Sequence, residues 1–303
     1  MAPMAGITDS TFRQMCKSFG SDVVYSEMTS ASVLFFDSKK TLELVNFEKK
    51  EQPYVVQLFG SNPEHFAKAA RTITEKVKPD GIDINFGCPA PKVFKQGSGC
   101  ALMPEKELAK KIISSVCNNT SLPVSIKIRA GIKNMTAKDF IENICDLPFF
   151  SVMIHGRTYE KGFSGTADFK IIEEIKKMIP EKIVLANGGI NTAEQAKNIL
   201  EQYPLLDGLG IGRGALGNPF IFQQIKEVLE DEAPHAYTFE EISGIALRHA
   251  KIMHQQRGDH GIIEMRKHLG WYFKGFSGAS EIRKSLMQVK SLEEIVKVIK
   301  VKV

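Results

Sequence analysis

Charged side chains stand at the ends of several β-rich segments of the sequence, where they could bind an anion. Lys127 and Arg129 close one such segment, and His155 and Arg157 close the next. Four cations gathered at one site would repel one another unless an anion or an acidic partner lies among them. We therefore expect a site that accepts a negatively charged ligand.

Two glycine clusters could cradle a phosphate. One is Asn187-Gly188-Gly189, and the other is the run 208–214, which contains Gly212-Arg213. Glycine lets backbone N–H groups approach phosphate oxygens, and an arginine can add a charge-assisted hydrogen bond. The run 212–217 also fits G-x-G-x-x-G, but a helix and a linker follow it, which argues against a dinucleotide-binding fold. Simple turns are the alternative for both clusters.

Cys88 is a candidate for proton transfer. It lies in Asn85-Phe86-Gly87-Cys88-Pro89, directly after a β-rich segment. A thiol with an ordinary pKa of roughly 8.5 is mostly protonated at neutral pH, which suits a general acid. The alternative is a small buried hydrophobic residue, the usual role of a free cysteine. The five cysteines form no Cys-x-x-Cys pair, which argues against a zinc site and a disulfide framework.

The elements that must position these residues alternate along the first 230 residues. Seven β-rich segments predict strands, and we expect Met1–Met4 to supply an eighth. The seven span 22–27, 54–59, 81–86, 124–128, 151–155, 183–187 and 209–212. Start signals such as Asp9, Asn62 and Thr192 predict helices between them. Eight strand–helix units favour an α/β fold, a (β/α)₈ TIM barrel with its chemistry at the strand ends. A doubly wound open sheet is the alternative.

The C-terminal part differs in pattern and in charge. After a polar linker near 230–235 the pattern is helical, with breaks near 258–261, 275–278 and 290–291. Residues 237–303 contain 12 Lys and Arg against 7 Asp and Glu, whereas the rest of the chain contains 28 of each. We predict two domains, a barrel over 1–232 and a small all-helical domain over 238–303 that binds a polyanion. A solvated helical face is the alternative.

A cluster in this tail could contact nucleic acid. Arg266, Lys267 and Lys274 lie close in sequence to Trp271 and Tyr272. The cations could meet phosphates while an aromatic ring stacks on a base. Helix packing is the alternative for the two aromatic residues.

Composition and the length of the apolar runs argue against a membrane, secreted, fibrous or disordered protein. The chain has 303 residues, 43% hydrophobic and 25% charged, as is typical of globular proteins. No apolar run approaches the ~20 residues needed to cross a bilayer, and no signal peptide is indicated. We expect a cytoplasmic monomer with no membrane contact and no metal.

Taken in order, the motifs resemble the tRNA-dihydrouridine synthase family over nearly the whole chain. The stretches that carry the likeness are 2–9, 57–60, 83–89, 127–129, 154–158, 187–190 and 212–215. The tail stretch 266–272 looks most like the bacterial B-type branch. The resemblance implies an enzyme that reduces the C5–C6 bond of selected uridines in tRNA to dihydrouridine. It also implies FMN as the cofactor and NADPH as the reductant.

The resemblance implies roles for individual residues as well. Cys88 would be the proton donor, while Asn85 and Arg129 would face the target uracil or the flavin edge. The residues implied for the flavin are Ala2, Pro3, Met4, Gln57, Lys127, His155, Asn187, Gly188, Gly189, Gly212 and Arg213. From its charge, the pair Arg266 and Lys267 would contact tRNA. Gly189 stands where the family commonly has an acidic residue, a change that a backbone cradle should tolerate.

Two other functions would each explain part of the sequence. A dihydroorotate dehydrogenase-like flavoenzyme acts on the same ring bond of a free pyrimidine, but it needs no basic helical tail. A non-catalytic RNA-binding protein would explain the tail but not Cys88 among the strand ends.

Overall fold

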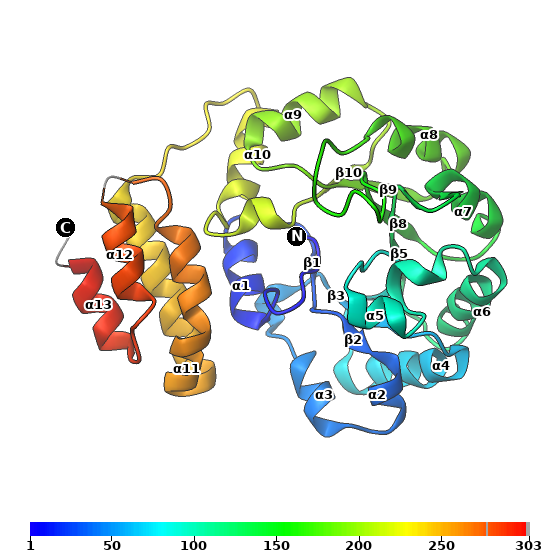
Figure 1. Ribbon diagram of the computed structural model, residues 1–303, viewed down its shortest axis with the longest axis horizontal. Helices are drawn as coiled ribbons and strands as arrows, with labels where there is room; N and C mark the ends of the chain where they lie inside the picture. The colour runs from blue at the N-terminus through cyan, green and yellow to red at the C-terminus, as the bar shows by residue number, and fades with distance from the viewer. Residues whose placement is uncertain (277, 301–303) are drawn as a thin grey trace.

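The computed structural model describes residues 1–276 and 278–300. Figure 1 shows strands at the centre, helices around them, and three C-terminal helices packed together at one side. The strands of the parallel sheet are β1 (Val24–Tyr25), β2 (Thr29–Ser30), β3 (Tyr54–Phe59), β4 (Gly81–Asn85), β5 (Val124–Arg129), β8 (Ser151–His155), β9 (Ile183–Asn187) and β10 (Gly208–Gly210). A separate two-stranded sheet pairs β6 (Gly131–Ile132) with β7 (Met135–Thr136).

The strand order identifies the architecture. The parallel sheet runs β1-β3-β4-β5-β8-β9-β10 in chain order, and β2 also pairs with β3. A doubly wound sheet would instead reverse its order at a switch point. The curled parallel sheet with helices outside it is a TIM-barrel arrangement, so the predicted fold class is confirmed.

The prediction of an eighth strand at Met1–Met4 is wrong. This segment instead bridges the two ends of the sheet. The backbone N of Met1 donates to the Val23 carbonyl beside β1, at 2.6 Å. The N–H of Ala2 donates to the Ile211 carbonyl after β10, at 2.7 Å. One hydrogen bond on each side links the sheet edges without building a ladder. The predicted strand 22–27 is also shortened to β1, and β2 resumes pairing with β3 further along.

Helices connect the strands on the outside of the sheet. They are α1 (Ser10–Ser18), α2 (Ala31–Phe35), α3 (Lys39–Leu44), α4 (Pro63–Thr72), α5 (Pro91–Lys95), α6 (Lys106–Cys117), α7 (Ala137–Ile144), α8 (Lys170–Met178), α9 (Ala193–Gln202) and α10 (Ile221–Leu229). Short turns of other helix types are η1 (Lys49–Glu51), η2 (Ile73–Val77), η3 (Gly99–Leu102) and η4 (Arg213–Ala215). Asp9, Asn62 and Thr192 each accept a hydrogen bond from a first-turn N–H, which confirms the predicted starts of α1, α4 and α9.

The C-terminal helices form a second apolar core against the barrel. They are α11 (Phe239–Tyr272), which kinks at Gly258, α12 (Ala279–Leu286) and α13 (Leu292–Lys300). Met15 of α1 and Phe220 of the barrel belong to this core, and α1 lies beside α11 (Figure 1). A Cβ at Gly217 would lie 2.3 Å from the backbone of Trp271, so only glycine permits this approach of barrel and tail.

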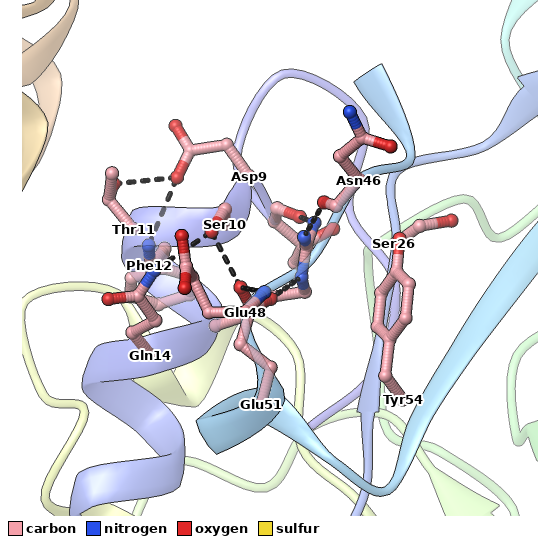
Figure 2. A network of polar contacts seen from close by, with 12 residues as sticks. Asp9, Ser10, Thr11, Phe12, Gln14, Ser26, Asn46, Glu48, Glu51 and Tyr54 are labelled. Atoms are coloured by element: carbon pink, nitrogen blue, oxygen red, sulfur yellow. Dashed lines mark hydrogen bonds and ion pairs between the residues drawn. The ribbon is translucent and has the colours of Figure 1, made fainter. Parts of the chain in front are cut away.

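A buried ion pair fixes the loop that follows the N-terminal segment. The Nε of Arg13 lies 2.5 Å from Glu51 Oε2, and both side chains are almost fully buried. The remaining guanidinium nitrogens donate to the carbonyls of Thr8 and Asn46, at 2.9 Å each. Figure 2 shows this network around Glu51, which also accepts from Ser10. Because the loop lines the mouth of the barrel, the network helps to hold that rim.

Candidate active site

A cavity of about 320 Å³ opens at the carboxyl ends of the strands. It collects the residues predicted for the cofactor, the proton donor and the target base. These are Ala2, Pro3, Met4, Gln57, Asn85, Cys88, Lys127, Arg129, His155, Asn187, Gly188, Gly189, Gly212 and Arg213. Arg266 and Lys267 of the tail do not line it. The structure therefore brings the predicted barrel residues together in one place.

Cys88 stands on the cavity wall in a backbone turn that is held from both sides. Its N–H donates to Asn85 Oδ1 at 2.8 Å, and the N–H of Gly87 donates to the same oxygen at 3.0 Å. The Cys88 carbonyl accepts from the N–H of Cys100 at 3.1 Å. Gly99 packs so closely that a Cβ there would lie 2.8 Å from this carbonyl. Cys100 itself is fully buried, and burial raises the pKa of its thiol to about 12.

A chain of buried polar side chains leads from this turn into the barrel. Asn85 Nδ2 donates to Gln57 Oε1 at 2.9 Å, and Gln57 Nε2 donates to Asp83 Oδ2 at 2.7 Å. The hydroxyl of Ser125 donates to Asp83 Oδ1 at 2.5 Å. Asp83 was not predicted as a site residue, because its place beneath Gln57 depends on the register between β3 and β4.

Lys127 bonds to an amide, and the charge of a buried carboxylate acts on it from a distance. Its Nζ donates to Asn187 Oδ1 at 3.1 Å, and Asn187 Nδ2 donates to the Gly210 carbonyl at 2.5 Å. Burial lowers the pKa of Lys127 to about 8, and the charge of Asp83 opposes this shift. Most Lys127 side chains are therefore protonated at neutral pH.

His155 is neutral in this setting. Burial lowers its pKa to about 2, and the cations Lys127, Arg129 and Arg157 add to the shift. Its Nδ1 accepts from the N–H of Arg157 at 3.3 Å, which assigns the hydrogen to Nε2. Gly188 lies against this nitrogen, since a Cβ there would be 3.0 Å from Nε2. His155 can therefore donate a hydrogen bond but not an acidic proton.

Arg129 joins two loops at the rim of the cavity. Its Nε donates to the Gly87 carbonyl at 2.9 Å, and its Nη1 donates to the carbonyls of Thr158 and Gly162 at 3.0 and 2.9 Å. The ring of Phe163 lies 5.6 Å from the Arg129 guanidinium and 4.3 Å from that of Arg213. Phe163 lines the cavity and is 56% exposed. No sequence pattern had marked it, because its loop has neither strand nor helix periodicity.

Arg157 carries a donor without a partner. Its Nε and Nη2 donate to the Gly165 carbonyl at 2.9 and 2.7 Å. Its Nη1 is buried and has no hydrogen-bond partner among residues 1–276 and 278–300. A Cβ at Gly189 would lie 3.2 Å from Nη2. Burial, and then the positive charge of Arg213, lower the pKa of Arg157. The sequence had identified Arg157 as a cation at a strand end, but had given it no role in cofactor binding.

The two tail cations predicted to contact tRNA differ in their partners: Arg266 bonds within the tail, and Lys267 bonds to the barrel. Arg266 Nε donates to the Val289 carbonyl at 2.8 Å, within the tail. Lys267 Nζ donates to the Gly6 carbonyl, which lies in the loop at the barrel mouth. Tyr272 is 2% exposed, so it packs in the core and is not available for stacking.

Comparison with known proteins decides the family. All 303 residues match the family model described as Dihydrouridine synthase (Dus). The chain belongs to this family. It is 35% identical over 308 residues to tRNA-dihydrouridine synthase B of Vibrio parahaemolyticus, covering 97% of this chain and 94% of that protein. It is 32% identical to a probable tRNA-dihydrouridine synthase of Mycobacterium leprae, covering 97% and 85%. The resemblance to the B-type branch is confirmed.

Two solved structures share the fold. Histamine dehydrogenase from Rhizobium sp. 4-9 superposes with a TM-score of 0.57 at 12% identity, covering 88% of this chain and 47% of that one. TcOYE with pHBA superposes with a TM-score of 0.52 at 11% identity, covering 80% and 91%. At such identities the likeness concerns architecture alone, and it agrees with the strand order.

The part of the chain that the structure describes has neither a cluster of metal ligands nor a membrane-spanning helix. Among residues 1–276 and 278–300, no three His, Cys, Asp or Glu side chains gather closely enough to hold a metal ion. None of the helices in the same ranges combines the length and apolarity that a membrane span requires.

Proposed function

We propose that this member of the dihydrouridine synthase family is an FMN-dependent enzyme that reduces the C5–C6 bond of specific uridines in tRNA, with NADPH as the reductant. The observation that carries the proposal is the placement of Cys88. A half-buried thiol lines the same cavity as two glycine turns and several cationic side chains. A proton donor and an anion cradle in one cavity are what this reduction requires.

The residues present fit the phosphate of FMN. Gly188 and Gly189 have φ of +113° and +75°, which exposes their backbone without a Cβ in the way. The unpartnered Nη1 of Arg157 and the guanidinium of Arg213 can each add a charge-assisted hydrogen bond. We assign the phosphate to Asn187, Gly188, Gly189, Gly212 and Arg213, with Arg157 as an added donor.

The remaining lining residues fit the ring system of a flavin. Ala2, Pro3 and Met4 would line it, and Gln57 and Lys127 would contact its polar edge. FMN, when bound, would supply the hydride that adds to C6 of the uracil. The Lys127 ammonium stabilises the negative charge that develops during the reaction, because it stays protonated at neutral pH.

Cys88 would complete the reduction of the base. Its protonated thiol gives a proton to C5 of the uracil, and the thiolate left behind takes a proton from solvent. Asn85 holds the backbone of this turn, and Arg129 holds the Gly87 carbonyl next to it. Arg129 therefore aligns the loop and places positive charge at the rim, while Nε2 of His155 can donate a hydrogen bond to the bound flavin or base.

A uridine inside folded tRNA must be splayed out to reach this cavity. We assign the flavin chemistry to residues 1–232 and tRNA binding to residues 238–303. Lys267 is a tail cation that reaches the mouth, through its bond to Gly6. Arg266 supports the tail through the Val289 carbonyl, so its contact with tRNA would use its remaining N–H groups.

The decisive experiment is to identify the cofactor and the substrate separately. The purified protein is denatured, the released flavin is identified by chromatography, and the reconstituted enzyme is assayed with NADPH on unmodified tRNA and on orotate. FMN and dihydrouridine in tRNA are expected. FAD or no flavin would overturn the cofactor assignment. Activity on orotate alone would support the dihydroorotate dehydrogenase-like alternative, and flavin-free tRNA binding would support an RNA-binding protein.

A further inference from the structure

A carboxylate lies buried beneath the cavity without a salt bridge. Asp83 is 0% exposed, and no ion pair among the described residues includes it. The sheet register places Gln57 and Ser125 opposite it on the neighbouring strands, and each donates one hydrogen bond to it. Burying a carboxylate with so little compensation is costly, so a role beyond packing is expected.

In the chain of hydrogen bonds between Asp83 and the Cys88 turn, each donor lies on the Cys88 side and each acceptor on the Asp83 side. An ionised carboxylate can only accept, so Gln57 must direct Nε2 toward it and Oε1 toward Asn85. Asn85 then directs Nδ2 toward Gln57 and leaves Oδ1 to accept from the N–H groups of Gly87 and Cys88. If either amide turned over, donors would face donors along the chain.

We propose that Asp83 is a positioning residue for the Cys88 proton donor, which it holds through Gln57 and Asn85. The proposal rests on the function proposed above and adds a residue to it. Asp83 does not line the cavity. It acts by fixing which way two amides face, and thereby the backbone turn that presents the thiol.

The test compares two replacements of Asp83. Asp83→Leu keeps a side chain that branches at Cγ but removes both acceptor oxygens. Asp83→Asn keeps one oxygen for Gln57, while its NH₂ can donate to the Ser125 hydroxyl. With enzyme reduced beforehand, Asp83→Leu should slow single-turnover reduction of tRNA about tenfold, the effect of one lost hydrogen bond of ordinary strength. Asp83→Asn should restore most of the rate.

Hydrogen exchange separates positioning from general loosening of the sheet. In Asp83→Leu, amides of the peptide 86–90 should exchange about tenfold faster, because Gly87 and Cys88 lose their fixed acceptor. Amides of β5 should keep their wild-type rates. Ser125→Ala, which removes the other bond to the same carboxylate, is the matched control and should behave like wild type in both measurements.

Several results would overturn the proposal. If Asp83→Asn were as slow as Asp83→Leu, the carboxylate would act through its charge on Lys127 instead of through the amides. Equal loss in Ser125→Ala, or faster exchange throughout β5, would mean a purely structural role. If Asp83→Leu does not fold, Asp83→Ser is used, since its hydroxyl is too short to reach Gln57. If wild type makes no dihydrouridine but binds flavin, the proposed function fails, whereas equal activity in wild type and Asp83→Leu refutes the role of Asp83 alone.

Discussion

Replacing the buried His268 with phenylalanine should stabilise the protein. The His268 ring is 0% exposed and lies 5.2 Å from the rings of Phe12 and Trp271, where α11 meets α1. Neither ring nitrogen has a partner within residues 1–276 and 278–300. Each unsatisfied group costs about 1–3 kcal/mol, and a slightly larger ring costs about 1–3 kcal/mol in packing. His268→Phe should therefore raise the free energy of unfolding at pH 7.5 by about 2 kcal/mol.

The difference in free energy of unfolding between His268→Phe and wild type should increase as the pH falls. Burial, and then the charges of His249 and Lys267, hold the pKa of His268 well below its ordinary 6.5. Below pH 6.5 the unfolded chain takes up a proton that the folded chain refuses, so the free energy of unfolding falls as the pH drops. The loss is about 1.4 kcal/mol per pH unit, or about 2 kcal/mol at pH 5. The variant lacks this loss, so its advantage should reach about 4 kcal/mol at pH 5.

His249 is the matched control, because its nitrogens have partners. Its Nε2 lies 3.1 Å from the Thr11 hydroxyl and its Nδ1 lies 3.2 Å from the Tyr272 hydroxyl. The Thr11 hydroxyl also donates to Asp9, as Figure 2 shows. His249→Phe would leave the buried Tyr272 hydroxyl without this partner and should destabilise the protein by about 1–3 kcal/mol at pH 7.5.

The assay is urea unfolding at pH 5.0, 6.0 and 7.5 with a fixed FMN concentration. Trp271 is the one tryptophan of the sequence and lies beside His268, so its fluorescence reports on this interface. The m-value should be the same for each protein, so that a shift in midpoint reflects stability. A His268→Phe variant that is less stable than wild type at pH 7.5, or that keeps the wild-type pH slope, would refute the reasoning.

Three further outcomes are expected from the site and the tail. Cys88→Ala should keep flavin binding and NADPH oxidation but lower dihydrouridine formation by ~10²–10⁴-fold, whereas Cys100→Ala should have little effect; mass spectrometry of tRNA nucleosides measures both. Gly188→Ala forces a Cβ into the φ +113° conformation, 3.0 Å from His155 Nε2, and should weaken FMN binding about tenfold in a fluorescence titration of the apoprotein. Lys267→Ala should lower tRNA affinity and reduce the log–log salt slope by about one unit, with flavin absorbance unchanged. An unchanged slope would place Lys267 away from the phosphates.

The inner strands were predictable because their signal is local. The bounds of β3, β4, β5, β8 and β9 lie within one residue of the predicted ranges. Period and composition reveal such strands, and the polar residues at or near their carboxyl ends follow directly. The strand predicted at Met1–Met4 is wrong because an extended sequence pattern does not show whether the adjacent strands can form a continuous set of backbone hydrogen bonds with it. The roles proposed for Arg157 and Asp83 depend on loop folding and strand register, which composition does not reveal.

The mouth of the barrel carries less positive charge than its residue types indicate. His155 is neutral, and Lys127 faces the buried charge of Asp83. Arg129 directs Nε and Nη1 at backbone carbonyls, and Arg157 directs Nε and Nη2 at the Gly165 carbonyl. The partial negative charge of these oxygens stabilises both guanidinium groups. Within residues 1–276 and 278–300, Nη1 of Arg157 is a buried donor without a partner, and its guanidinium lies beside the glycine turn that ends in Gly189. One phosphate at this turn could therefore accept from this donor and from Arg213, which the proposed function assigns to the same phosphate.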